Sequence, residues 1–332
     1  MHATRYNEVT TARGLCPGFS LIRVAMQTSV TVRVPGSTSN LGAGFDCVGV
    51  AIDRWLTLTA RVLPASGAAV AIERRGSLTA VTVPPGQDLC CRGFLRACDA
   101  SGRGAPSGVV LQAESSVPVA RGLGSSAAAT VAGAVAANAL LGLGLERDTL
   151  VYLCTALEGH PDNVAPAVHG GAVLSIGAAA GKGLVVTPLA VHPSLAFVLA
   201  VPDFVLETKQ ARAVLPDQVS HATAASAAAR AAALIQGLAT GDARLLAIAL
   251  EDVLHVPFRR CLVPGYDTVV AAALGAGAFG ATLSGSGPTI LALASVGAAP
   301  GVGAAMVRAW REAGIQAESM VPARPPGGYE IV

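Results

Sequence analysis

The segment PVARGLGSSAAA, residues 118–129, holds residue types well suited to binding a phosphate. Glycines let the backbone turn sharply and approach an anion closely, and serine is a common N-cap. The alanine-rich run that follows predicts a helix, whose first N–H groups lie unpaired at the positive end of the helix dipole. The segment predicts a phosphate seat, although a glycine turn capped by serine fits these residues equally well. If the segment binds phosphate, a valine in place of Gly124 would lie where the backbone contacts the phosphate.

Three further polar segments add groups that bind charged ligands. They are PGSTSNLGAGFD at 35–46, LEGHPDN at 157–163 and a second glycine-serine loop, GATLSGSGPT, at 280–289. Their chemically notable side chains are Asn40, Asp46, Glu158, His160, Asp162 and Asn163. Each segment alone fits an ordinary turn. Four such segments in one apolar chain indicate a binding site.

Two other nucleotide-binding patterns fit poorly. The segment at 177–183 lacks the spacing of a P-loop and has no hydroxyl residue after Lys182. The glycines at 275–280 have dinucleotide-binding spacing, but they follow a helical pattern and lead into a strand, the reverse of the required order. The segment at 122–127 fits a looser form of that fingerprint, yet the acidic residue downstream, Glu146, lies at a helix junction. A Rossmann fold is therefore disfavoured.

The composition excludes several classes of protein. Of 332 residues, 52% are hydrophobic and 13% charged, with a net charge of +2. Disorder would require the opposite balance, and nothing in the charge favours nucleic acid. The stretch 122–145 is uncharged and long enough to span a bilayer. However, alanine dominates it and four polar residues interrupt it, so we expect a buried helix and no membrane insertion.

The cysteines and the N-terminal residues indicate an intracellular location. Seven cysteines occur, an odd number, and no C-x-x-C pair is present. Free thiols in a reducing compartment fit this pattern, so we expect a cytoplasmic protein. Residues 1–25 lack the apolar core of a signal peptide and are expected to form a poorly ordered extension.

Hydrophobic periodicity predicts the elements that position these segments. Strands are expected at 30–34, 47–52, 56–62, 70–73, 79–83, 108–115, 172–176, 196–201, 281–283, 290–292 and 316–321. Helices are expected at 89–100, 125–141, 147–158, 219–239, 242–254, 267–274 and 303–313. We expect loops at 35–46 and 159–171 and a loose C-terminal tail. Strands and helices do not alternate regularly, which favours an α+β fold.

The motifs together resemble those of the GHMP kinases, which include galactokinase, homoserine kinase and mevalonate kinase. The pattern P-x-x-x-G-L-G-S-S-A-A is present without a gap at 118–128. The resemblance is greatest to the homoserine kinases, over about residues 28–321. It rests on SNLGAGFDCVGVAID, EGHPDNVAPAVHGG, ETKQAR with HVPFR, and LSGSGPT. The chain departs from the family pattern at Ala43, where proline is frequent, and at Ala227, where asparagine is frequent.

The resemblance implies a site for ATP and Mg²⁺. The expected ATP-binding residues are Pro118, Val119, Ala120, Arg121, Gly122, Leu123, Gly124, Ser125, Ser126, Ala127 and Ala128. The last glycine loop contributes Gly285, Ser286 and Gly287. Glu158 matches the carboxylate that holds Mg²⁺, together with Ser126. A hard cation bound by one carboxylate and substrate phosphates suits Mg²⁺.

The resemblance also implies an amino-acid pocket. Its expected residues are Asn40, Asp46, His160, Thr208, Arg212 and Arg259, with Asn163 beside the reacting hydroxyl. An ammonium requires an acid such as Asp46, and a carboxylate suits arginine. Asn163 cannot accept a proton as a base, so the catalytic residues Asn163, Glu158 and Ser126 are expected to act by position and charge. Asp162 is an alternative base, although it is more simply explained as a helix cap.

The implied fold has two α+β domains. An S5 domain 2-like N-terminal domain is expected at 26–195, and a ferredoxin-like C-terminal domain at 196–332. The implied function is ATP-dependent phosphorylation of L-homoserine in threonine biosynthesis, by a homodimer that binds no nucleic acid. Another GHMP kinase, acting on an isoprenoid or sugar alcohol, is the main alternative. A non-catalytic ligand sensor on the same fold is the other.

Overall fold

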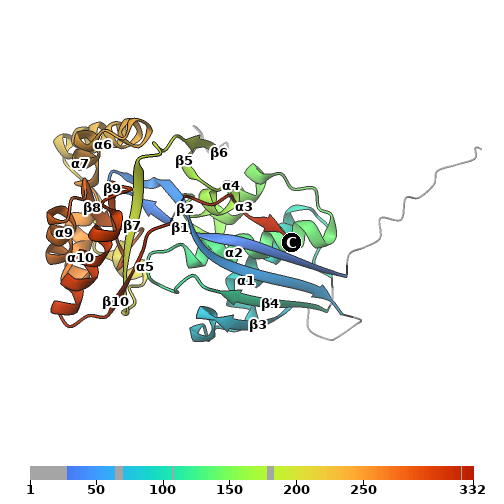
Figure 1. The fold of residues 1–332 in the computed structure, drawn as a ribbon. Helices are drawn as coiled ribbons and strands as arrows, with labels where there is room; N and C mark the ends of the chain where they lie inside the picture. Colours follow the sequence, from blue (N-terminus) through green and yellow to red (C-terminus); the bar gives the residue numbers. More distant parts are fainter. Residues whose placement is uncertain (1–27, 64–69, 107, 178–182, 323) are drawn as a thin grey trace, which may run out of the picture.

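The computed structural model describes residues 28–63, 70–106, 108–177, 183–322 and 324–332. The expected extension at 1–25 lies outside these residues. Figure 1 shows two groups of elements side by side, with the N-terminal strands on one side and the orange and red helices on the other. Each group is built on its own sheet, which confirms the α+β class.

The first group contains a seven-stranded sheet with the order β11-β1-β2-β4-β3, extended by β5 on β2 and by β6 on β5. Its strands are β1 (Ser29–Asn40), β2 (Gly44–Val62), β3 (Val70–Gly76), β4 (Val109–Ser115), β5 (Ala172–Gly177), β6 (Leu184–Leu189) and β11 (Glu330–Ile331). Its helices are α1 (Leu89–Ala100), α2 (Ser125–Leu141), α3 (Arg147–Glu158) and α4 (Val164–His169). β3 runs parallel to β4, and the other pairs are antiparallel.

The second group contains a four-stranded antiparallel sheet with the order β10-β7-β9-β8. Its strands are β7 (Leu195–Pro202), β8 (Gly280–Leu283), β9 (Ile290–Ser295) and β10 (Ala317–Met320). Its helices are α5 (Thr208–Ala213), α6 (His221–Thr240), α7 (Ala243–Leu250), α8 (Val256–Arg259), α9 (Tyr266–Gly275) and α10 (Ala299–Glu312).

Three apolar clusters hold these layers together. One lies between the first sheet and helices α1 to α4, and a second lies under α9 and α10. The third joins the two groups, because Val50 and Ile52 of β2 pack with Phe197 and Leu199 of β7 and with Leu234 of α6. The two sheets therefore share a buried apolar contact.

The expected positions of α1, α2 and α3 are confirmed to the residue. Local caps explain these ends: Asp88 accepts hydrogen bonds from the N–H groups of Cys90 and Cys91, and Gly142 ends α2 at φ 58°. The uncharged stretch that contains α2 lies in the protein core. Within the described residues, no helix combines the length and apolarity needed to cross a membrane.

Four expectations for local structure are wrong. Residues 79–83 form no strand, because the chain leaves β3 at Gly76 with φ 61° and turns through the 3₁₀ helices Ser77–Ala80 and Pro85–Gln87. Residues 35–46 are not simply a loop, since β1 pairs with β2 as far as Asn40 opposite Gly44. The segment 159–171 contains helix α4. Apart from these errors, three short elements, β6, α5 and α8, were not expected.

The fourth error concerns the C-terminal tail, which is not loose. Strand β11 pairs antiparallel with β1, and Val332 N donates to Thr31 O. Gly327 forms an isolated bridge with Gly170 at the end of α4, and the Arg147 guanidinium lies 4.4 Å from the Tyr329 ring centroid. The tail thus leaves the second group and closes an edge of the first sheet (Figure 1).

Helices α1 and α2 cross at two glycines. A Cβ at Gly133 would overlap the carbonyl oxygen of Cys90, and one at Gly93 would overlap that of Thr130. Both obstacles are backbone atoms, which cannot move aside as a flexible side chain can. This close approach requires glycine on each helix.

We therefore expect Gly133→Ala to destabilise the protein by about 1–3 kcal/mol, the usual cost of overpacking a core. Gly301→Ala is the matched control, because Gly301 lies in α10 with no heavy atom within 4 Å of its added Cβ. The control is expected to raise stability by up to about 1 kcal/mol, since alanine restricts the unfolded chain. Denaturant unfolding followed by circular dichroism measures both changes. Equal effects at the two positions would contradict the steric argument.

Candidate active site

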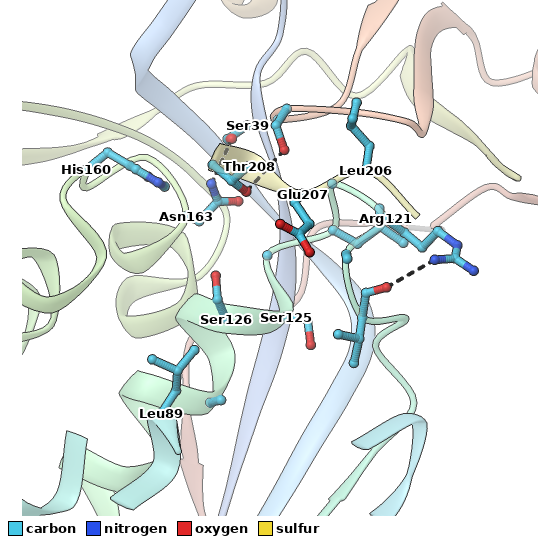
Figure 2. Close-up of a pocket in the computed structure, with 18 of the residues that line it drawn as sticks. Ser39, Leu89, Arg121, Ser125, Ser126, His160, Asn163, Leu206, Glu207 and Thr208 are labelled. Carbon is cyan, nitrogen blue, oxygen red and sulfur yellow. Dashed lines mark hydrogen bonds between the residues drawn. The ribbon is translucent and has the colours of Figure 1, made fainter. Parts of the chain in front are cut away.

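All four polar segments meet at one cavity of about 470 Å³ (Figure 2). Its wall includes the end of β1, the central loop at 119–124, the start of α2 and residues 160–163. Residues 206–208 and the last glycine loop complete it from the second group. The expected clustering of these distant segments is confirmed.

The central loop is held by backbone contacts with two other segments. Ser37 N donates to Leu123 O at 3.0 Å, and the Ser284 hydroxyl donates to Gly122 O at 2.6 Å. Gly285 N donates to Ser39 O at 3.0 Å. A Cβ at Gly122, where φ is 73°, would overlap Ser284 O. We call this contact of residues 37–40, 122–124 and 284–287 the three-segment junction.

Helix α2 begins beside this junction with its first N–H groups uncapped. Gly124 is the N-cap residue at φ 68°, and no side chain caps the helix. The expectation that serine caps α2 is therefore wrong: Ser125 and Ser126 are its first two residues, and Ser126 is exposed. The open N–H groups and the helix dipole at this end are chemically suited to an anion.

The expected effect of a valine at Gly124 needs correction. A Cβ there would overlap the Ser37 hydroxyl and lie 3.1 Å from Asn163 Oδ1. The side chain would point into the three-segment junction, at a backbone conformation that favours glycine. The substitution would disturb packing as well as any phosphate, so it is not a clean test of phosphate binding.

The Glu158 carboxylate lies at the end of α3, beside α2. The Thr130 hydroxyl donates to Glu158 Oε1 at 2.7 Å. Thr130 follows Ser126 by four residues on α2, so the two side chains lie on the same face of that helix. Glu158 is adjacent to the cavity and does not itself line it.

Asn163 is held by three neighbours. Its Oδ1 accepts from the Ser37 hydroxyl at 2.9 Å, and its Nδ2 donates to the Ser39 hydroxyl at 2.9 Å and to Asp162 Oδ1 at 3.1 Å. The side-chain amide is therefore fixed against the cavity wall, where Figure 2 shows it beside Ser39.

His160 and Asp162 form a close pair, with Nδ1 and Oδ1 at 2.7 Å. Burial raises the pKa of Asp162, but its hydrogen bond and the charge of His160 lower that pKa to a net value below the usual 3.8. Burial likewise lowers the pKa of His160, while Asp162 raises it to a net value above 6.5. Asp162 is not a helix cap as expected, because no side chain caps α4.

Asp46 and Arg212 form a two-pronged ion pair on the cavity wall. Arg212 Nη2 lies 2.7 Å from Asp46 Oδ1, and Nη1 lies 3.1 Å from Oδ2. The hydrogen bond to Asp46 raises the pKa of Arg212. Asn40 fixes this region, since its Oδ1 accepts from Asp46 N and its Nδ2 donates to Gly285 O.

Arg259 is only 1% exposed although it borders the cavity. Its Nε donates to Ala211 O at 2.9 Å, its Nη1 contacts His255 Nδ1 at 3.3 Å, and its guanidinium lies 5.2 Å from the Phe45 ring centroid. Burial and the nearby charge of Arg212 lower the pKa of Arg259 to about 10. Burial lowers the pKa of His255 to about 4, so this imidazole is neutral.

Several expected residues do not line the cavity. They are Pro118, Ala127, Ala128, Glu158 and Gly287. Arg121 borders it, but its guanidinium donates to Pro202 O at 2.9 Å and to Asp203 O at 2.6 Å. Figure 2 shows this side chain pointing away from Ser126 and Asn163. The Thr208 hydroxyl does face the cavity, 3.3 Å from that of Ser286.

The sequence prediction missed an apolar recess in the cavity. Its side chains are Leu78, Val81, Val83 and Leu89, with Gln87 and Asp88 at its edge. Arg74 fixes this wall by donating to Val83 O at 2.7 Å and to Asp88 Oδ2 at 2.9 Å. Ordinary apolar residues in a turn give no sequence signal for such a recess. Glu207, whose carboxylate faces the cavity in Figure 2, was also missed.

Comparison with known proteins identifies the class to which this fold and site belong. Residues 89–171 match the family description "GHMP kinases N terminal domain", and residues 234–316 match "GHMP kinases C terminal". The chain belongs to the GHMP kinase family.

Within that family, the chain is similar to homoserine kinases over most of its length. It is 45% identical over 295 residues to homoserine kinases of Trichormus variabilis and Nostoc sp., and covers 96% of each. The match involves 89% of this chain. The crystal structure of homoserine kinase from Cytophaga hutchinsonii superimposes with a TM-score of 0.83 at 32% identity, over 94% of this chain and 100% of that one.

The His160–Asp162 pair generates a prediction for pH dependence. We expect NMR titration to give His160 a pKa above 6.5 in the wild type and below 6.5 in Asp162→Asn. Without the Asp162 charge, burial and the charge of Arg212 lower the pKa of His160, and Asp46 alone of these neighbours raises it. His169 is the internal control, because burial keeps its pKa below 6.5 in both proteins.

The same pair fixes the sign of a stability change. The contribution of the pair to the free energy of unfolding is complete between pH 3.8 and pH 6.5, the pKa values of Asp162 and His160 in the unfolded chain. It is lost as pH rises through the native pKa of His160 or falls through that of Asp162. The wild type is therefore expected to exceed Asp162→Asn in unfolding free energy most clearly near pH 5. An advantage that grows above pH 7 would contradict this assignment.

Proposed function

We propose that this protein transfers the γ-phosphoryl group of ATP to the hydroxyl of L-homoserine, giving O-phospho-L-homoserine for threonine synthesis. The observation that best supports this substrate is the oppositely charged pair of Asp46 and Arg212 beside the uncapped start of α2. The pair matches the two charges of an amino acid, and the helix start matches a phosphate. The identity to homoserine kinases over most of the chain supports the same reaction.

The ATP triphosphate is expected to lie against the central loop and the first turn of α2. The N–H groups there can donate to phosphate oxygens, and the Ser126 hydroxyl is exposed beside them. The recess of Leu78, Val81 and Leu89 then receives the base, because a flat heterocycle buries well against apolar side chains. Arg74 and Asp88 keep that wall in place.

The donor set beside α2 fits Mg²⁺. Glu158 and the Ser126 hydroxyl offer hard oxygen atoms on one side of the first turns of the helix. Mg²⁺ often uses one or two carboxylates and takes its other ligands from phosphates and water, so a cluster of protein ligands is not needed. When bound, Mg²⁺ supplies positive charge that offsets the developing charge on the phosphate oxygens.

Homoserine is expected to bind with its ammonium at Asp46 and its carboxylate at Arg212, with Arg259 behind. His160, Asn40 and Thr208 border the same space. Asn163 orients the hydroxyl and takes no proton, since an amide is not a base at neutral pH. The phosphoryl transition state is loose, so catalysis rests on alignment and charge, and the proton can pass directly to a γ-phosphate oxygen.

A substrate panel tests this function. ADP release should be rapid with L-homoserine and slow with mevalonate, shikimate, galactose and threonine. Mevalonate, shikimate and galactose all lack the ammonium that would match Asp46, which disfavours the isoprenoid and sugar kinases of this family. Preferred turnover of another alcohol would overturn the proposal, and ATP binding without turnover would support a sensor.

Two further aspects of the protein belong to the proposal. The cysteines that the structure describes are all free thiols, which suits the cytoplasm. A homodimer is proposed by analogy with the family.

Glu158→Gln tests the assigned metal carboxylate, because it keeps the shape and removes the charge. We expect kcat at limiting Mg²⁺ to fall by at least about 10²-fold, the effect of losing one preorganised electrostatic contact. Glu146→Gln is the matched control at the other end of the same helix, where the side chain is exposed. The control is expected to keep wild-type turnover. Equal Mg²⁺ dependence in both variants would exclude Glu158 as the metal carboxylate.

A further inference from the structure

Asp46 and Arg212 pair with each other on the cavity wall and neutralise each other's charge. The two N–H···O distances are 2.7 Å and 3.1 Å, and the side chains of Asp46 and Arg212 are 35% and 38% exposed on the cavity wall. The carboxylate is fixed at its base, since Asn40 accepts the Asp46 N–H and φ of Asp46 is 56°. A ligand that uses either charge must first break this pair.

We propose that this resting ion pair is a substrate filter, which opens only for a ligand carrying an ammonium and a carboxylate on the same carbon. The inference rests on the proposed function. A zwitterion replaces both partners at once: its ammonium takes the place of Arg212 beside Asp46, and its carboxylate takes the place of Asp46 on Arg212. A ligand with one charge can replace only one partner.

The neighbouring charges make it unfavourable to replace only one partner of the ion pair. A carboxylate without an ammonium would engage Arg212 and leave Asp46 unpaired in a wall that also contains the buried anion of Asp162. An amine without a carboxylate would engage Asp46 and leave Arg212 facing the like charge of Arg259. Removing one partner of this partly buried pair is costly because the other charge stays unpaired.

Neighbouring groups cannot rescue the charge that is left alone. Arg259 is committed to Ala211 O, Gly285 O and His255, and is 1% exposed. His160 is held by Asp162 at 2.7 Å. The filter therefore consists of one acid and one base that, among the described residues, can exchange partners only with each other and with the ligand.

The test compares L-homoserine with its two single-charge analogues. 4-Hydroxybutanoate lacks the ammonium, and 3-amino-1-propanol lacks the carboxylate. ADP release at saturating ATP gives kcat/KM for each in the wild type, Asp46→Asn and Arg212→Gln. Asp242→Asn is the matched control, since Asp242 pairs with Arg244 on the exposed surface far from the cavity wall.

The filter predicts that both site variants lose activity on L-homoserine and that each gains activity on a different single-charge analogue. Both site variants should lose about 10²-fold or more on L-homoserine, the effect of breaking a charge pair in an interface. Asp46→Asn should gain about tenfold over the wild type on 4-hydroxybutanoate, because Arg212 no longer has a partner to give up. Arg212→Gln should gain similarly on 3-amino-1-propanol. The control should keep the wild-type order of the three ligands.

Parallel losses on both analogues in both variants would overturn the filter and show that Asp46 and Arg212 make only ordinary binding contacts.

If a variant fails to fold, an experiment on the wild-type protein tests the filter. Methylammonium should raise its turnover of 4-hydroxybutanoate, by occupying Asp46 while the analogue takes Arg212, and potassium at equal ionic strength should not. Absence of this rescue also overturns the filter. Failure of the proposed function is a separate result: the wild type would not phosphorylate L-homoserine at all.

Discussion

The close backbone approach at the three-segment junction is the constraint on which the site depends. Segments as far apart as Asn40 and Gly285, 245 residues along the chain, are joined there by hydrogen bonds that a Cβ at Gly122 would prevent. The junction fixes the start of α2 and leaves its N–H groups open. It also anchors Asn163 through Ser37 and Ser39. The start of α2 and the cavity wall around Asn163 are therefore held by the same junction, so a shift of one would disturb the other.

Charge in the cavity is organised as separate pairs. Arg74 with Asp88 fixes the apolar recess, His160 with Asp162 fixes the wall behind Asn163, and Arg212 with Asp46 borders the open space. The first two pairs are largely buried and each has a role within the wall. The third is about one-third exposed, so a ligand can reach it. The two buried pairs thus hold the cavity wall in place, whereas the more exposed pair of Arg212 and Asp46 can exchange partners with a ligand.

The sequence was informative wherever local chemistry decides structure. Helices 89–100, 125–141 and 147–158 follow from periodicity and glycine or aspartate at their ends. The polar segments were recognised because they combine glycine and serine with carboxylate and amide side chains, in a chain with only 13% charged residues. Long-range partners were not accessible in this way. Nothing near Asp46 marks Arg212, 166 residues away, as its partner. The recess around Leu78 uses residue types that occur in any core, and its shape depends on Arg74 reaching across a turn.

Because β11 pairs with β1, the first sheet is complete only after residues 330 and 331 have been synthesised. Strand β1 is among the earliest described residues to leave the ribosome, yet Arg33 meets its partner Glu330 only after 297 further residues have been made. Until then one edge of that sheet exposes unpaired backbone groups, which are a template for association with other chains. Pairing across such a sequence separation also closes slowly. The nascent chain is therefore expected to be prone to association until that edge is covered, and a bulky fusion directly after Val332 would crowd the same edge.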